Sequence, residues 1–287
     1  QLFIVEESVF MTKNRIQILK EKMLSQPRYV SIEQALIITK TYKQHENEPI
    51  ILKRAYALAN ALRELEIGIE NEELIVGNRT KGVRYGVVFP ESGISWVDRE
   101  FETISTRKQD KFLVRDEDIK IFREQIVPYW KGKSLEDVIK QNFGKEISAI
   151  NKVVKINQTD HAQGHICPNV EKWLQKGVSG LLEDAQNHYK NADEDKKNFY
   201  QAIIIVMKAV QNFMLRYHDL LIATAKDDEK NRASLIKVAD ICKNISQRPP
   251  QTFHEAVQAT WFLFVILHME SNASSFSPGR LDKILYP

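Results

Sequence analysis

Residues 252–287 read TFHEAVQATWFLFVILHMESNASSFSPGRLDKILYP, and the order of apolar and polar residues in this stretch decides the fold. Residues 252–269 predict a helix that is apolar nearly all round, which is typical of the interior of a large protein. Polar residues within it, among them His254 and His268, favour a buried helix over a membrane span. A polar turn rich in hydroxyl groups follows, so we expect this helix to deliver polar groups into a pocket.

Length and composition exclude several classes of protein. A chain of 287 residues that is 43% hydrophobic can bury a substantial core. Its 41 basic and 38 acidic residues are evenly spread, which predicts a solvated surface and neither a nucleic-acid nor a membrane partner. The two cysteines, Cys167 and Cys242, form neither a disulfide framework nor a CxxC metal motif. We therefore expect a cytoplasmic protein.

The first ten residues differ from the rest of the chain in what they predict. Residues 1–10 have no positively charged region before their apolar residues, so they do not resemble a signal peptide. Met11 looks like a natural start. We expect residues 1–10 to be a non-native or disordered leader, and residues 11–287 to form the folded part.

Hydrophobic periodicity predicts a mostly α fold with a few short strands. Helices are expected over residues 13–25, 31–45, 49–62, 96–104, 119–127, 170–189, 193–224 and 226–245, with another after Ser134. Strands are expected at 74–77 and 85–90. Ser31 and Gln34 fit a capping box, and Pro128 is expected to end a helix. The acidic residues 116–118 are interpreted as the start of a helix and not as a metal site.

Residues 159–169 gather two histidines, one cysteine and one aspartate. His161, His165 and Cys167 are three possible zinc ligands, but a closed site needs a fourth, so we expect no metal. A nucleophilic Cys167–His pair is disfavoured because Pro168 removes the next backbone N–H donor. The simplest interpretation is a loop histidine satisfied by backbone carbonyls.

The motif E-S-N-x-x-S-x-S-P-G-R-x-D-x-x-x-Y-P resembles the segment that enters the barrel of glycyl radical enzymes, the pyruvate formate-lyase-like group of dehydratases, choline lyase and arylacetate decarboxylases. Four other stretches agree in order and spacing: residues 73–77, 89–91, 128–133 and Gly164-His165. The resemblance implies that residues 11–287 are the N-terminal, largely helical portion of such an α/β barrel, truncated before its catalytic Cys and Gly loops.

The resemblance also implies a site. In dehydratases of the family a Gly-His places an imidazole on the substrate hydroxyl, which points to His165 as the catalytic group. Ser274, Ser275 and Asn169 are the implied substrate-binding residues. The family's neighbouring His-Ser pair is Ser274-Ser275 here, so its histidine is absent. Asn169 stands where some relatives carry an acidic residue, which gives no carboxylate for a cationic substrate.

Groups needed for radical chemistry are missing from the sequence. None of its 11 glycines lies in an R-V-x-G-Y loop, and neither cysteine lies in a C-x-E loop. The resemblance therefore implies a fragment that binds no cofactor and is inactive alone. The parent would be a homodimer that acts on a small organic substrate, with a glycyl radical installed by a radical S-adenosylmethionine activating enzyme. The alternative is a non-catalytic helical scaffold or binding module.

Two further expectations concern residues 252–287. Arg280 and Asp282 are interpreted as a buried ion pair. The apolar helix at 252–269 is expected to leave several hundred Å² of apolar surface exposed, because the barrel strands that would wrap it are not in this sequence, and the chain alone is expected to self-associate.

Overall fold

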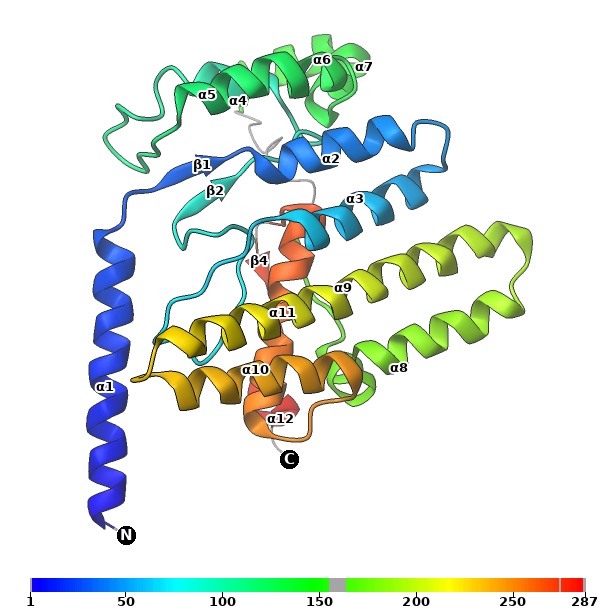
Figure 1. The fold of residues 1–287 in the computed structure, drawn as a ribbon. Coiled ribbons are helices and arrows are strands. Elements are labelled where there is room, and N and C mark those ends of the chain that lie inside the picture. The colour runs from blue at the N-terminus through cyan, green and yellow to red at the C-terminus, as the bar shows by residue number, and fades with distance from the viewer. Residues whose placement is uncertain (1, 155–163, 274, 286–287) are drawn as a thin grey trace.

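The structure is a computed structural model that describes residues 2–154, 164–273 and 275–285, with side chains from residue 14 onward. Helices dominate these residues and the strands are few and short, as the sequence predicts (Figure 1). The first half contains α1 (Leu2–Ser25), β1 (Tyr29–Ser31), α2 (Glu33–Gln44), α3 (Ile50–Glu64), β2 (Tyr85–Val87), α4 (Ser95–Glu100), α5 (Asp116–Ile121), the π-helix η1 (Phe122–Ile126), α6 (Val127–Trp130) and α7 (Leu135–Ile150). The second half contains β3 (His165–Ile166), α8 (Val170–Lys190), α9 (Glu194–Asp227), α10 (Arg232–Gln247), α11 (Phe253–Ser271), β4 (Ser275–Phe276) and α12 (Leu281–Ile284).

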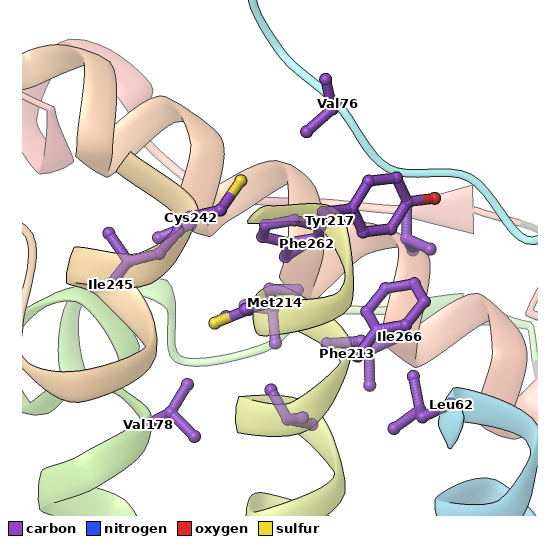
Figure 2. Packing of buried hydrophobic residues seen from close by; sticks show 14 of the residues in the cluster. Leu62, Val76, Val178, Phe213, Met214, Tyr217, Cys242, Ile245, Phe262 and Ile266 are labelled. Atoms are coloured by element: carbon purple, nitrogen blue, oxygen red, sulfur yellow. The ribbon is translucent and has the colours of Figure 1, made fainter. Parts of the chain in front are cut away.

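The larger hydrophobic core lies where α9 meets α11. Helices α3, α8, α9 and α10 form an antiparallel array, and α11 runs across them (Figure 1). Rings of Phe213, Tyr217 and Phe262 contact one another at centroid distances of 5.1–5.8 Å in this core (Figure 2). These apolar positions follow the helical spacing that the sequence predicts for 193–224, so the array forms as expected.

A second core joins α2 to the segment formed by α5, η1 and α6. Trp130 is buried there, and its indole N–H donates to Thr39 Oγ1 at 2.8 Å. Pro128 lies in the first turn of α6, where a missing N–H costs little, so it does not end the helical segment as predicted. The π-helix η1 carries the chain into this turn.

The predicted capping box at the start of α2 is wrong. Ser31 belongs to β1, and the N-cap of α2 is Ile32, which makes no side-chain cap. Gln34 is buried and donates through Nε2 to the carbonyl of Met269 at 2.9 Å. The Gln34 side chain, which the local pattern assigned to a helix cap, makes a long-range hydrogen bond instead.

Residues 74–77 are not a strand, and helix α11 explains why. His254, Gln258 and Trp261 lie on one face of α11 and bond to the backbone of this extended segment. Gln258 bonds to both backbone groups of Val76, accepting from its N–H at 2.9 Å and donating to its carbonyl at 2.7 Å. Side chains of a helix therefore satisfy the groups that a neighbouring strand would otherwise bind.

The same contacts cover part of α11. Phe253 and Trp261 are its exposed large apolar residues, at 68% and 39%, and both lie in the N-terminal half of the helix. Phe262, Val265 and Ile266 are buried, because the helical array and residues 74–78 cover α11. Among the described helices, none is long and apolar enough to cross a bilayer.

Candidate functional site

Two short parallel strands bring two of the predicted site residues together. In the register of β3 and β4, His165 is the partner of Ser275, and Ile166 is the partner of Phe276. The N–H of Ser277 extends this pairing by donating to the carbonyl of Ile166 at 2.8 Å. Neighbouring strands lie about 4.8 Å apart, and register partners face the same side of the sheet. The side chains of His165 and Ser275 are therefore neighbours.

Ser275 brings a hydroxyl group to β4. Its Oγ is buried and has no hydrogen-bond partner within the described part of the chain. Buried polar atoms are nearly always paired, so an unpaired hydroxyl in a protein interior calls for an explanation. A serine hydroxyl both donates and accepts, which suits a substrate hydroxyl or an anionic oxygen. His165, in contrast, is exposed.

Asn169 has a structural role in the described residues. It is the N-cap of α8, and its Oδ1 accepts from the N–H of Lys172 at 2.9 Å. A capping oxygen of this kind stabilises a helix N-terminus. Its predicted contact with substrate remains a prediction.

Two of the predicted residues fall outside the described residues. Ser274 and His161 are not described, so the implied role of Ser274 and the zinc hypothesis that includes His161 remain predictions. Among the residues that are described, no three His, Cys, Asp or Glu side chains gather as a metal-binding group.

The ion pair of Arg280 and Asp282 forms, but it is not buried. Arg280 Nε donates to Asp282 Oδ1 at 3.0 Å, and the two side chains are 78% and 65% exposed. Both residues lie at the start of the short helix α12, on the surface of the described structure. The hydrogen bond from Arg280 lowers the pKa of the Asp282 carboxyl.

The last turn of α11, shortly before β4, is held by side chains from far away in the sequence. Gln34 of α2 bonds to the carbonyl of Met269, and Arg54 of α3 donates to the carbonyl of Glu270 at 3.2 Å. Asn272 then ends the helix in the left-handed conformation, with φ of 46°. These contacts, three to six residues before β4, fix where the helix ends.

Arg54 lies between two carboxylates. It bonds to the Glu270 side chain and donates through Nη1 to Glu91 Oε1 at 3.3 Å. Glu91 also accepts from the hydroxyl of Tyr42 at 2.5 Å. Burial raises the pKa of Glu91, while the charge of Arg54 and the Tyr42 hydrogen bond oppose that shift. Burial of Tyr42, together with the Glu91 charge, raises the pKa of its phenol.

A histidine and an arginine flank the same turn. Burial lowers the pKa of His268, and the charge of Arg79 adds to this effect, against a hydrogen bond between His268 Nδ1 and the carbonyl of Phe264 at 2.8 Å. Arg79 Nη1 lies 3.5 Å from Asn272 Oδ1. The ring of Phe264 also meets Phe276 of β4 edge-on at 5.4 Å. Local sequence patterns gave no signal for Arg54 or Arg79, and Glu91 was singled out only as part of the stretch 89–91 that carries the family resemblance.

The model of the pyruvate formate lyase-like family matches residues 11–287. The chain belongs to this family. Its relatives confirm the resemblance to glycyl radical enzymes. The probable dehydratase YbiW of Escherichia coli is 33% identical over 270 residues, which cover 90% of this chain and 33% of the relative. The (2S)-3-sulfopropanediol dehydratase of Klebsiella oxytoca is 29% identical, over 95% of this chain and 35% of the relative.

Solved structures agree with this assignment. The glycerol-bound, B12-independent glycerol dehydratase of Clostridium butyricum superposes with a TM-score of 0.90 at 32% identity, over 96% of this chain and 36% of that enzyme. A glycyl radical enzyme of Archaeoglobus fulgidus gives a TM-score of 0.88 at 32% identity, over 95% and 36%. The chain thus spans about a third of the length of the pyruvate formate lyase-like relatives that it matches.

Proposed function

We propose that this chain forms the N-terminal part of a glycyl radical enzyme, a dehydratase or lyase of a small organic substrate. The observation that carries the proposal is the pairing of β3 with β4, which sets His165 beside the unpaired hydroxyl of Ser275. Similarity to dehydratases along nearly the whole chain supports the reaction class. The same similarity to dehydratases disfavours the alternative function, a non-catalytic scaffold.

The two residues suit complementary tasks. An imidazole gives and takes a proton near neutral pH, so His165 assists the departure of a substrate hydroxyl as water. The Ser275 hydroxyl orients the substrate by a hydrogen bond. Asn169 supplies no charge, and Ser274 stands where dehydratases of the family carry a histidine. We therefore propose a neutral or anionic hydroxylated substrate and do not extend glycerol dehydration to this chain.

Radical chemistry is assigned to polypeptide beyond these 287 residues. No glycine here has an R-V-x-G-Y context and no cysteine a C-x-E context, so the residues present do not fit the radical-bearing groups. We propose that a downstream barrel portion supplies them, that an activating enzyme installs the glycyl radical, and that the 287 residues alone are inactive. The proposal includes a homodimer that works anaerobically in the cytoplasm.

The test uses the enzyme of which we propose this chain to be a part. His165→Ala should lower kcat by about 10²- to 10⁴-fold, the usual contribution of a general acid–base group. The glycyl radical should form normally by electron paramagnetic resonance, because His165 does not carry it. His188→Ala is the control, since His188 is exposed on α8 and stacks on Tyr200. Normal turnover of His165→Ala with a normal radical signal would refute the catalytic role.

A further inference from the structure

The C-terminal end of α11 is anchored by two side chains from the N-terminal part of the chain. A helix leaves its last four carbonyls without intrahelical partners. In α11, the carbonyl of Met269 accepts from Gln34 and that of Glu270 accepts from Arg54. The carbonyl of His268 is bonded within the cap, by the N–H of Asn272 at 3.2 Å. Side chains of α2 and α3 therefore fix the position of the last turn.

Arg54 is the stronger of the two anchors because it binds both the backbone and the side chain of Glu270. Although burial acts to lower it, the carboxylates of Glu91 and Glu270 raise the pKa of Arg54, so its guanidinium stays charged. Glu91 is itself fixed by the Tyr42 hydroxyl. Charge-assisted hydrogen bonds with two planar partners define both the position and the orientation of a guanidinium.

The anchored turn leads directly into the candidate site. Five residues after Glu270 the chain reaches Ser275, and between them Asn272 ends α11 in the left-handed conformation. A displacement of Glu270 along or around the helix axis would move β4 relative to β3. A slip of one residue in this pairing would turn the Ser275 hydroxyl to the other face of the sheet, away from His165.

We propose that Arg54 is a positioning residue of this site, which holds the end of α11 so that Ser275 lies opposite His165. The effect of Arg54 on catalysis rests on the proposed function, whereas its effect on the position of Ser275 does not. The guanidinium of Arg54 donates to Glu270, at the end of α11, and to Glu91. The side chain is 36% exposed, so it adds little apolar packing to either core.

A disulfide between positions 165 and 275 tests, in this chain, whether Arg54 holds these two positions opposite each other. In a Cys167→Ser background, the pair His165→Cys and Ser275→Cys occupies register partners about 4.8 Å apart, which suits a disulfide. We measure the rate of disulfide formation with oxidised glutathione. Arg54→Ala should slow this reaction about tenfold, because loss of the charge-assisted bonds frees the turn. Arg54→Lys, which keeps the charge but replaces the planar guanidinium with a single ammonium group, should recover part of the rate.

Two controls separate positioning from general loosening. The pair Tyr29→Cys and Tyr85→Cys occupies register partners of β1 and β2, which Arg54 does not touch, so its rate should not change. Arg248→Ala removes an arginine at the other end of α11 and should leave the 165–275 rate unchanged. An unchanged 165–275 rate in Arg54→Ala, or equal slowing of both cysteine pairs, would overturn the proposal.

Two further measurements complete the test. Tyr42→Phe is a milder variant that removes only the bond to Glu91, and it should slow the 165–275 reaction less than Arg54→Ala. It keeps the proposal testable where Arg54→Ala does not fold by circular dichroism, and an unchanged rate in both Tyr42→Phe and Arg54→Lys would then count against it. In the longer enzyme, Arg54→Ala should lower kcat more than it raises KM. An active His165→Ala enzyme would refute the proposed function and leave the disulfide result standing.

Discussion

The two ends of helix α11 are stabilised in different ways. At the N-terminal end, Glu255 accepts from the N–H of Gln251, from Arg248 and from Asn244, while Thr252 Oγ accepts from the N–H of Glu255. Every one of these partners lies within 11 residues of Glu255.

The C-terminal end of α11 depends on distant residues instead. Its two anchors, Gln34 and Arg54, are separated from their partners by 235 and 216 residues. The cap at the N-terminal end can therefore form as soon as its own segment folds, and long-range bonds from His254, Gln258 and Trp261 to residues 74–77 come in addition to it. At the C-terminal end the anchors themselves are distant, so this end is complete only when the N-terminal helices have packed. The end whose cap depends on distant residues is the one that leads to the candidate site.

The sharpest way to break the N-terminal end is Glu255→Ala. The Glu255 side chain is buried, and its removal leaves Arg248 and Asn244 without their partner. We expect a loss of about 3 kcal/mol in the free energy of unfolding, the usual cost of breaking such a pair. Urea denaturation measures it, and hydrogen exchange should rise at residues 251–255. A loss below about 1 kcal/mol would show that this end is not held by Glu255.

Arg54→Ala tests the other end and should cost less overall, about 2 kcal/mol, because Arg54 is partly exposed. Its local effect should lie elsewhere in the chain. Amide exchange should rise at Ser277, whose N–H bonds to Ile166, and remain unchanged at Glu255. Equal protection changes at both ends would show that α11 responds as one unit, and the contrast between its ends would fail.

Low pH should weaken the N-terminal end of α11 through protonation of Glu255. Burial tends to raise the pKa of Glu255, but hydrogen bonds from Arg248, the Gln251 N–H and Asn244 outweigh it and lower the pKa below the ordinary 4.5. A lowered folded-state pKa contributes stability that is present above pH 4.5 and lost as the pH falls through the folded value. Glu255→Gln should therefore flatten the fall in stability below pH 4.5, as measured by urea denaturation at stepped pH. An unchanged slope would mean that other carboxyls control acid unfolding.

The smallest expected effect belongs to Gln34→Leu. The substitution keeps the volume but leaves the carbonyl of Met269 without its donor, at a cost of about 1 kcal/mol. Arg54 still holds Glu270 in this variant, so the disulfide rate between positions 165 and 275 should change by less than in Arg54→Ala. A larger effect on that rate than that of Arg54→Ala would make Gln34 the principal anchor.

Sequence reasoning succeeded where the determinants are local. Periodic apolar residues predicted α8, α9 and α11 closely, and Ser134 was correctly identified as the cap of α7, its Oγ accepting from Asp137 at 3.2 Å. The resemblance to glycyl radical enzymes singled out His165 and Ser275, but residue patterns gave no reason to pair them. Two-residue strands are too short to carry a periodic signal, so their register appears only in the structure.

Long-range contacts account for the failures. Gln34 fitted a capping box because it follows Ser31 by three residues. Its partner in the structure is Met269, which is far away in the sequence and cannot be found from a local pattern. Residues 74–77 looked like a strand because three of their side chains are apolar and two of these are β-branched. Side chains of a helix, and not a neighbouring strand, bind their backbone. Arg280 and Asp282 are two residues apart, so they can pair whether they are buried or exposed. Their spacing therefore does not predict burial.

The two hydrogen bonds between the Gln258 side chain and the backbone of Val76 restrict which residue can occupy position 258. One side-chain amide here imitates a peptide group, presenting a donor and an acceptor to the same residue. Asparagine has the same chemistry on a shorter stem, and glutamate would set a carboxylate against a carbonyl oxygen. Position 258 therefore admits glutamine and little else. The segment at 74–77 cannot slide by one residue along α11 without losing both bonds, so a single glutamine fixes the alignment of residues 74–77 along α11.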